Sequence, residues 1–427
     1  MKTTKSYRPL VSILALMMAG SAMANDVRLD LLTDNSPNSL AAANALVNAY
    51  MEENPGVRIE VEVRPGGSEG DNIVRSRLAT GSMSDLFFYN SGSLLQALNP
   101  SRTLVDLSNE PFMDNVLPSF QSVVEANGGI YGVPAEAGMG GGILYNRDIY
   151  AELGLEVPTT WDQFMDNNTV IAEAGYAPVI GTFRDTWTSQ LFVLADYFNV
   201  MQEDPDFHAE FTAGNRTFAE STPALRSFER MQSVHEAGYF NTNYDSAGYE
   251  DGLRMLVEGE GAHYPMLTFA ISAIVETFGD QVDNVGFFAQ PGDSPDANGL
   301  TVWMPGSLYI NQDSSHIDEA KDFLAFVAST RGCEVIIDEI GASGPFLIEG
   351  CGLPDDVPQP VADMLVYFED PERNAPALEF LSPVKGPSLE QITVEIGSGI
   401  RDARSGAELY DRDVRRQARQ LGLDGWN

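Results

Sequence analysis

The segment 27–89 alternates between strand-like and helix-like patterns. Apolar Val57, Ile59 and Val61 are separated by polar residues, which is the two-residue period of a half-buried strand. Strands are expected at 27–32, 57–63 and 85–89, and helices at 40–50 and 71–80. Because this order needs helical connections that cross over a sheet, it predicts a mostly parallel sheet flanked by helices. In such sheets ligands bind outside the carboxyl ends of the strands.

A second alternating region begins near residue 131. A strand is expected at 143–145 and a helix from Asp148, and Thr160 with Gln163 forms a capping box that starts another helix. Further strands are expected at 177–180, 261–266, 285–289 and 307–310, and a helix at 317–328. Since 427 residues exceed the usual size of one compact core, the sequence predicts two α/β lobes.

The N-terminus carries an export signal. Lys2, Lys5 and Arg8 precede an apolar run at 10–19, and Ala22-Met23-Ala24 follows as a cleavage site of the A-x-A type. The apolar run is too short to span a bilayer, so a membrane anchor is the weaker interpretation. We expect residues 1–24 to be a signal peptide and the mature chain to be periplasmic.

The charge of the chain limits its partners. The formal net charge is −37 at pH 7, and the signal contributes only cations, so the mature chain is more acidic still. Such a field repels nucleic acids and anionic lipids, which excludes both as partners. We interpret the acidity as a solvated surface and expect no metal or other cofactor.

Cys333 and Cys351 are the two cysteines of the chain. Export to an oxidising compartment favours a disulfide between them. The alternative is two free thiols in the interior of the protein.

Four stretches resemble one known family. They are Gly129-Ile130-Tyr131-Gly132-Val133-Pro134, then Leu144-Tyr145-Asn146-Arg147-Asp148 with Gly154-Leu155 and Pro158-Thr159-Thr160-Trp161, then 256–262, and Gly306-Ser307-Leu308-Tyr309-Ile310 with the helix at 319–326. Their order and spacing together resemble extracellular solute-binding protein family 1, the maltose-binding-protein-like sugar-binding proteins of ABC transporters.

The resemblance implies a type II periplasmic binding protein fold. Two lobes, each a mostly parallel sheet flanked by helices, would be joined by a hinge that the chain crosses more than twice. The N-terminal lobe would comprise 25–134 and 299–346, and the C-terminal lobe 135–298 and 347–427. The resemblance also implies a monomer that binds a carbohydrate between its lobes and delivers it to the permease subunits of an ABC importer, without catalysis.

Candidate site residues come from strand ends and from the resemblance. Sugars present apolar C–H faces and hydroxyl rims, so their sites combine flat aromatic rings with carboxylates and amides. The strand ends offer Asn35, Ser36, Tyr89 and Asn90. Positions that match the family pattern add Glu136, Asp185, Trp187, Phe269, Trp303, Gly306 and Ser307.

Several of these residues have a structural alternative. Tyr89 and Phe269 could be core residues, and Phe269 replaces the tryptophan that the family usually carries at its position. Capping the first helix could be the only role of Asn35 and Ser36.

Other functions remain as alternatives. A receptor for a polyamine or a glycerophosphodiester is one, and an anionic solute would need cations such as Arg75, Arg77 and Arg184. A secreted hydrolase is another, because Gly66-Gly67-Ser68-Glu69-Gly70 matches the G-x-S-x-G elbow. The glycine-rich setting favours a flexible loop over a strained elbow. A glycosidase would also use paired carboxylates. Because such pairs arise by chance among 62 acidic residues, their spacing alone does not exclude a glycosidase.

Overall fold

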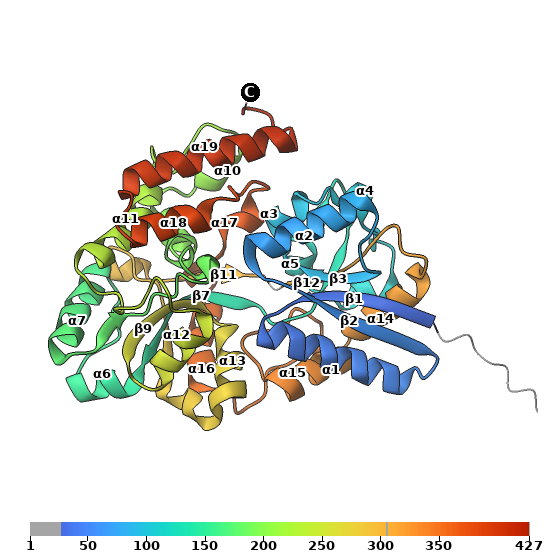
Figure 1. The fold of residues 1–427 in the computed structure, drawn as a ribbon, viewed down its shortest axis with the longest axis horizontal. Helices are drawn as coiled ribbons and strands as arrows, with labels where there is room; N and C mark the ends of the chain where they lie inside the picture. The colour runs from blue at the N-terminus through green and yellow to red at the C-terminus, as the bar shows by residue number, and fades with distance from the viewer. Residues whose placement is uncertain (1–26, 305, 427) are drawn as a thin grey trace, which may run out of the picture.

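The structure is a computed structural model that describes residues 27–304 and 306–426. The expected signal peptide at 1–24 lies outside the described residues. The described chain forms two α/β lobes that lie side by side (Figure 1), the first mostly blue and orange and the second mostly green, yellow and red. Within the described residues no helix is long and apolar enough to cross a membrane.

The first lobe is built on a sheet with the strand order β2-β1-β3-β12-β6. Its strands are β1 (Val27–Asp34), β2 (Val57–Arg64), β3 (Leu86–Tyr89), β6 (Gly132–Pro134) and β12 (Ser307–Ile310). The first three run parallel, whereas β12 is antiparallel to β3 and β6. The carboxyl ends of β1 and β3 point toward the second lobe (Figure 1). The predicted parallel β-α-β-α-β unit is therefore confirmed.

Helices complete the first lobe. They are α1 (Pro37–Glu53), α2 (Gly67–Thr80), α3 (Gly92–Gln96), α4 (Pro100–Thr103), α5 (Pro118–Gln121), α14 (Ile317–Val327) and α15 (Thr330–Ile340). Tyr50 of α1 meets Phe323 of α14 edge to face, with ring centroids 5.1 Å apart. The apolar stripe of α1 thus packs against helices that come much later in the chain.

The second lobe has the strand order β13-β11-β7-β9-β8, with β10 also paired to β7. Its strands are β7 (Met139–Asn146), β8 (Ala177–Val179), β9 (Gly261–Leu267), β10 (Val285–Ala289), β11 (Leu300–Trp303) and β13 (Asn374–Pro376). β7 is antiparallel to β9, β10 and β11, while the pairs β8–β9 and β11–β13 are parallel. One reversed strand in a mostly parallel sheet thus recurs in both lobes.

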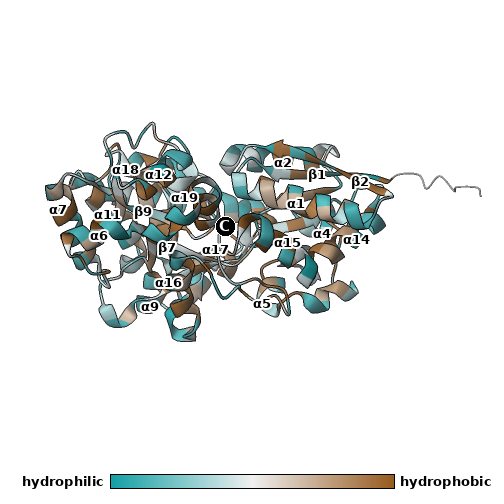
Figure 2. Cartoon of the chain, turned by 90° about the horizontal axis from the view of Figure 1, so that it is seen from below, coloured by the Kyte–Doolittle hydropathy of each residue, from teal (hydrophilic) through white to brown (hydrophobic). Residues whose placement is uncertain are grey.

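The helices of the second lobe surround this sheet. They are α6 (Arg147–Leu153), α7 (Trp161–Ala174), α8 (Leu191–Leu194), α9 (Tyr197–Glu203), α10 (Phe207–Thr212), α11 (Thr222–Glu236), α12 (Tyr249–Val257), α13 (Ala270–Phe278), α16 (Gln359–Phe368), α17 (Leu378–Leu381), α18 (Leu389–Gly397) and α19 (Ala403–Leu421). The expected capping box is present at α7, where the Thr160 hydroxyl accepts a hydrogen bond from Gln163 N. Viewed from below, α17 lies between the lobes (Figure 2).

The chain passes between the lobes after β6, after β11 and after α15. Two of these passages are joined directly, because Gly138 N donates to the carbonyl oxygen of Pro345 at 2.7 Å. A side chain at Gly344 could not fit, since its Cβ would lie 2.0 Å from the Gly138 carbonyl oxygen. The repeated crossing agrees with the hinge that the resemblance implies.

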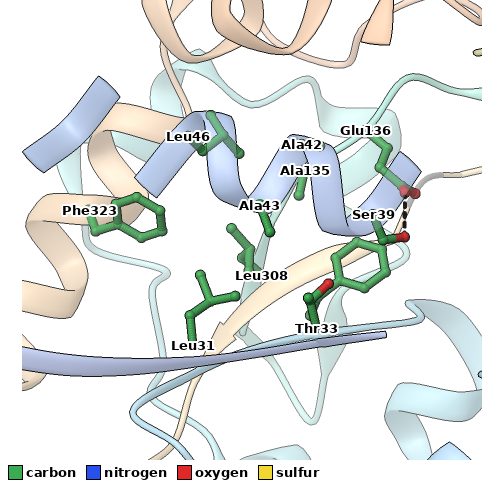
Figure 3. A pocket seen from close by; sticks show the side chains of 11 residues that line it. Leu31, Thr33, Ser39, Ala42, Ala43, Leu46, Ala135, Glu136, Leu308 and Phe323 are labelled. Atoms are coloured by element: carbon green, nitrogen blue, oxygen red, sulfur yellow. Dashed lines mark hydrogen bonds between the residues drawn. The ribbon is translucent and has the colours of Figure 1, made fainter. Parts of the chain in front are cut away.

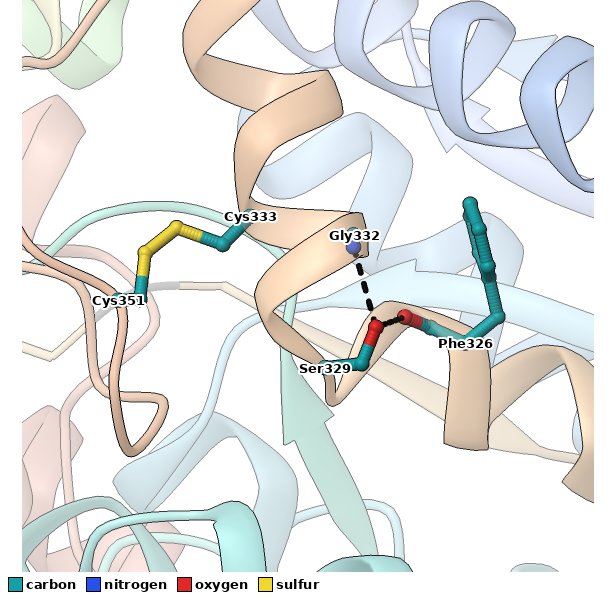
Figure 4. The surroundings of a disulfide bond; sticks show 5 residues. All are labelled: Phe326, Ser329, Gly332, Cys333 and Cys351. Atoms are coloured by element: carbon teal, nitrogen blue, oxygen red, sulfur yellow. Dashed lines mark hydrogen bonds between the residues drawn. A yellow bond between two sulfur atoms is a disulfide. The ribbon is translucent and has the colours of Figure 1, made fainter.

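The disulfide ties the third passage to the first lobe. Cys333 in α15 is bonded to Cys351, with Cα atoms 6.3 Å apart (Figure 4). Just before it, Leu117 N donates to Leu347 O at 3.0 Å and Glu349 N donates to Asn115 O at 2.7 Å. The bonded pair is the one that the sequence favours.

Sheet membership differs from the expected lobe limits at two places. β11 pairs with β7 of the second sheet, although a return to the first lobe was expected at residue 299. Residues 347–351 are held by the first lobe, although they were expected in the second. We propose lobes of 27–134 with 306–351 and of 139–303 with 358–426.

Candidate functional site

The two lobes touch along the face where the parallel strands end. Asn38 in the first turn of α1 donates from Nδ2 to the carbonyl oxygen of Phe269 at 2.7 Å. A Cβ on Gly67, at the start of α2, would lie 3.7 Å from Glu390 Oε2 and 3.9 Å from Cδ1 of Trp187. These contacts join segments that are far apart in the sequence and define the interlobe face.

Three aromatic rings of the second lobe form a cluster at this face. Trp187 lies 5.3 Å from Tyr249 and 5.9 Å from Phe269, and Tyr249 lies 5.9 Å from Phe269, measured between ring centroids. The Tyr249 hydroxyl is buried and has no hydrogen-bond partner within the described part of the chain. Burial raises the pKa of Tyr249 well above the usual value for tyrosine, so the hydroxyl stays protonated. It is a neutral donor and acceptor buried beside two flat rings.

The Asp185 carboxylate helps to position this cluster. Its Oδ2 accepts a hydrogen bond of 2.7 Å from Tyr249 N, at the first residue of α12. The short 3-10 turn Thr186–Thr188 that begins after Asp185 carries Trp187. Asp185 therefore holds Tyr249 through its carboxylate, and it holds the turn that carries Trp187 through its backbone carbonyl oxygen, which accepts from Thr188 N at 2.9 Å.

Glu136 lies in the first passage between the lobes. Its Oε2 accepts from Gly306 N at 3.3 Å, and its Oε1 accepts from Ser39 Oγ at 3.5 Å. Burial, followed by the nearby carboxylate of Asp34, raises the pKa of Glu136 to about 7. A carboxyl group with two long hydrogen bonds beside a second acid is poorly stabilised as an anion.

Glu136 and Ser39 also close one end of a narrow cavity inside the first lobe. Figure 3 shows them there, with Leu46 and Phe323 toward the other end. The lining is otherwise apolar, with Thr33 as a further polar member. Glu136, which was expected to face the cleft from the hinge, thus lies in the passage after β6 with its carboxylate buried at the margin of the first lobe's core.

Asn35 and Ser36 serve the turn between β1 and α1. The Asn35 side-chain oxygen accepts from Gly66 N at 3.0 Å, which links the turns that precede α1 and α2. The Ser36 hydroxyl donates to Asp34 Oδ1 at 2.6 Å and lies 2.8 Å from the hydroxyl of Ser39. Ser36 occupies the N-cap position, but its side chain accepts no capping hydrogen bond.

Tyr89 is fully buried at the end of β3, so its ring presents no face to the interlobe region. The Arg64 guanidinium lies over the ring, 5.7 Å from the centroid. Asn90 next to it is exposed, and its carbonyl oxygen accepts from the Tyr309 hydroxyl at 3.2 Å. Of these two predicted site residues, Asn90 has an exposed side chain. Tyr89 is a core residue, which is the alternative that the sequence left open.

Trp303, Gly306 and Ser307 lie where the chain returns to the first lobe. The Trp303 side chain is 6% exposed, packs on Gly141, and donates from Nε1 to Glu379. Gly306 is buried, and its backbone N–H is already donated to Glu136. Ser307 is fully buried and donates its hydroxyl to Val133 O at 3.0 Å. We leave Ser307 and Tyr89 out of the proposed site because neither reaches the interlobe face.

Sequence reasoning missed Asn38, Tyr249, Glu379 and Glu390. Asn38 follows Ser36 by two residues, so the polar start of the first helix was a usable signal. Tyr249 precedes the family-like stretch at 256–262 by one helix, but no motif marks it. Glu379 accepts from Lys385 Nζ at 3.1 Å, and Lys385 is one of two lysines after the signal, which makes it conspicuous.

The hydrolase-like motif does not form a nucleophile elbow. Residues 66–70 were expected to be a flexible loop, but α2 begins at Gly67 and places Ser68 in its first turn. An elbow needs a strained backbone at the nucleophile, whereas the non-glycine residues with positive φ in the described chain are Asn99 and Asn127. The expected loop is wrong because the glycines enter the first turn of a helix that buries Gly70 and Val74.

His263 is buried between the Tyr150 hydroxyl at 2.7 Å and Asn168 Oδ1 at 2.9 Å, and burial lowers its pKa to about 3. Across residues 27–304 and 306–426 there is no group of three or more His, Cys, Asp and Glu that could hold a metal ion.

Comparisons with known proteins agree on one family. Residues 33–332 match the model of the bacterial extracellular solute-binding proteins. The multiple sugar-binding protein of Streptococcus mutans serotype c is 22% identical over 314 residues, which cover 73% of each chain.

Solved structures show the same fold. The binding protein RafE in complex with raffinose superposes with a TM-score of 0.76 at 21% identity, covering 92% of this chain and 99% of RafE. A chitin oligosaccharide binding protein superposes with a TM-score of 0.80 at 19% identity, covering 92% of this chain and 100% of that protein.

Proposed function

Because this chain belongs to the family of bacterial extracellular solute-binding proteins, we propose that it is the carbohydrate-binding subunit of an ABC importer. It is exported to the periplasm, works as a monomer, holds a sugar between its lobes and hands it to membrane permease subunits. It performs no covalent chemistry. The observation that carries this proposal is the cluster of Trp187, Tyr249 and Phe269, in which the backbone carbonyl of Phe269 accepts a hydrogen bond from Asn38 of the other lobe.

The cluster has the chemistry that a sugar requires. Flat rings cover the C–H face of a pyranose, and a phenol beside them serves its hydroxyls as donor or acceptor. The Tyr249 hydroxyl and the Asn38 Oδ1 are both buried without a partner among the described residues. A sugar hydroxyl bound between them satisfies two groups whose burial is otherwise unfavourable.

The first lobe supplies the opposite wall. Asn35 and Asn90 follow the ends of β1 and β3, Asn38 lies in the first turn of α1, and Glu136 lies at the hinge. We propose that the ligand enters between this wall and the aromatic cluster. The lobes then close on it by rotation about the three passages, as hinge closure around a ligand does in other two-lobed binding proteins.

An oligosaccharide fits this arrangement better than an ion. RafE, the chitin oligosaccharide binding protein and the multiple sugar-binding protein are similar proteins whose names specify sugars. Two charged groups near the face already have partners, since Lys385 pairs with Glu379 and Glu390 accepts a hydrogen bond from the Thr186 hydroxyl at 2.9 Å. A neutral ligand leaves these pairs intact, so we favour it over a polyamine or a phosphodiester.

A thermal-shift screen tests the proposal. The mature protein is heated with raffinose, melibiose, maltose, xylobiose, chitobiose, spermidine and glycerophosphocholine, each at millimolar concentration. A ligand that binds the folded protein raises the melting temperature. We expect at least one of the sugars to do so and neither spermidine nor glycerophosphocholine. Stabilisation by spermidine alone, or release of reducing ends from an oligosaccharide during incubation, contradicts the proposal.

A further inference from the structure

Helix α19 presents a row of positive charge on a strongly acidic chain. The sequence has 62 acidic residues against 25 lysines and arginines. Five of the arginines nevertheless fall within α19, and all five are exposed: Arg404, Arg412, Arg415, Arg416 and Arg419. Because a helix has about 3.6 residues per turn, side chains three, four, seven or eight positions apart lie on one face. We call this face the basic stripe.

The opposite face of α19 anchors the helix on the second lobe. Ala407, Tyr410, Val414 and Ala418 are buried there, and the Tyr410 ring meets that of Phe218 at a centroid distance of 5.2 Å. The helix lies at the outer edge of the lobe (Figure 1). The basic stripe is therefore held in place by a packed core, with its charges toward solvent.

The middle of the basic stripe is not neutralised by the protein itself. Arg412 and Arg415 form no ion pair with another residue of the described chain. Arg416 pairs with Asp413, which is buried on the far side of the helix. Glu408 lies exposed four positions before Arg412 but makes no ion pair with it in this structure. Two guanidinium groups are thus left without a partner at the centre of the stripe.

The two ends of the stripe also keep their charge. Arg404 donates to the carbonyl oxygen of Ala219 at 3.0 Å, and Arg419 donates to that of Trp426 at 2.6 Å. A carbonyl oxygen carries no net charge, so these bonds fix the side chains without neutralising them. The helix dipole stabilises cations within the last turn only, where Arg419 lies. Neither the dipole nor an ion pair explains the arginines in the middle.

We propose that the basic stripe docks against an acidic protein surface on the membrane subunits of the importer. The assignment rests on the proposed function, which supplies that partner. At physiological ionic strength a charge acts over about 8 Å. A partner in contact with α19 therefore meets the arginines rather than the net charge of the whole chain. Complementary charges speed the encounter and fix the orientation of the two proteins.

A protein partner fits the stripe better than a lipid surface does. Asp402 and Asp424 lie exposed before and after α19, and Glu408 lies exposed within it. A continuous plane of anionic headgroups laid along the helix meets these acids as well as the arginines. A protein surface of limited width contacts the arginines alone, so it avoids this repulsion.

Uptake measurements with purified protein test the proposal. Cells that lack this chain are converted to spheroplasts, and the mature protein is added with the radiolabelled sugar identified by the thermal-shift screen. The double variant Arg412→Glu with Arg415→Glu should raise the protein concentration that gives half-maximal uptake by about tenfold or more. Its sugar affinity by calorimetry should stay within about twofold of wild type, and its melting temperature should be unchanged.

Two further variants serve as controls. Arg58→Glu with Arg102→Glu makes the same change of charge at two exposed arginines of the first lobe. Arg412→Lys with Arg415→Lys keeps the charge of the stripe. Both should support uptake as wild type does. Added sodium chloride should weaken the uptake driven by wild type more than that driven by the Arg412→Glu, Arg415→Glu variant, because salt screens the attraction.

The outcomes separate the docking surface from the proposed function. Equal uptake with wild type and the Arg412→Glu, Arg415→Glu variant, or an equal loss with the first-lobe control, overturns the stripe and leaves the proposed function standing. A wild-type protein that binds no sugar and supports no uptake refutes both. Cosedimentation with phosphatidylglycerol vesicles that depends on Arg412 and Arg415 assigns the stripe to lipid instead. A wild-type dimer that the same double variant converts to a monomer assigns it to a second copy of the chain.

Discussion

Asn38 Nδ2 and the carbonyl oxygen of Phe269 are joined by a 2.7 Å hydrogen bond between residues 231 positions apart. This bond connects the first turn of α1 to the loop after β9, so one side chain links the two lobes where the proposed ligand lies. The other atom of the same amide, Oδ1, is buried and has no partner in the described chain.

Asn38→Asp therefore tests the contact between the lobes. The substitution preserves size, but it removes the donor and places a carboxylate oxygen against a carbonyl oxygen. We expect a more open protein without ligand, seen as a larger radius of gyration in small-angle X-ray scattering, and about tenfold weaker sugar binding. Asn72→Asp, on the surface of α2, is the control. An unchanged radius of gyration contradicts the role of Asn38.

Tyr249→Phe separates ligand binding from stability. The hydroxyl makes no hydrogen bond within the described residues, so its removal should leave the melting temperature unchanged or slightly higher. Sugar affinity should fall by about 1 kcal/mol, because the hydroxyl serves the ligand. Calorimetry and thermal denaturation of the same preparation measure both. A lower melting temperature with unchanged affinity would assign the hydroxyl to the fold instead.

Trp187→Ala tests the aromatic cluster directly. Loss of a packed aromatic anchor weakens binding by about 2 kcal/mol, roughly 30-fold. Trp161→Ala is the matched control, since that indole packs on Phe164 at a centroid distance of 5.0 Å, away from the interlobe face. The control should lower the melting temperature and leave affinity unchanged. The reverse pattern contradicts the site.

The alternation of Val57, Ile59 and Val61 was sufficient to predict a strand, because a two-residue apolar period matches the way successive strand side chains point to opposite faces of a sheet. The pairing of that strand with β1 followed from the helical connection. The disulfide also followed from export chemistry alone. These features depend on local patterns, which a sequence displays directly.

Features that depend on tertiary contacts were not predictable in this way. β11 is buried on every residue, and a uniformly apolar strand does not reveal which sheet it joins. Tyr89 ends its strand as expected and Trp303 ends β11, for which no strand was predicted. Whether either ring faces the core or the other lobe depends on packing from distant segments. Tyr249 is recognised as a candidate site residue only in the structure, where Asp185, 64 residues earlier, accepts its backbone N–H.

Glu136 predicts a specific pH dependence. Its pKa is raised from 4.5 to about 7, so between these values the folded protein retains a proton that the unfolded chain has released. The contribution of this group to stability is therefore full below about pH 4.5 and declines as the pH rises through 7.

Glu136→Gln should remove this dependence. The difference in melting temperature between variant and wild type should shift in favour of the variant between about pH 5 and pH 8. Glu52→Gln, at an exposed position of α1, should show no such shift. A difference that does not change with pH means that Glu136 is solvated as an anion.

Removal of the disulfide should lower the stability of the folded protein and leave sugar binding largely unchanged. Cys333 and Cys351 are 18 residues apart, and closing a loop of that length stabilises the folded state by about 3 kcal/mol. The double variant Cys333→Ser with Cys351→Ser should show this loss in urea denaturation while still binding sugar at low temperature. Denaturation that is identical with and without reductant contradicts the presence of the bond.

A crystal structure with the most stabilising sugar of the thermal-shift screen tests the central claim most directly. The account predicts electron density for the sugar between Asn38 and the rings of Trp187, Tyr249 and Phe269, with a ligand hydroxyl bonded to Tyr249 Oη. Density for the sugar on an outer surface of either lobe, with the aromatic cluster still packed against the first lobe, would contradict it.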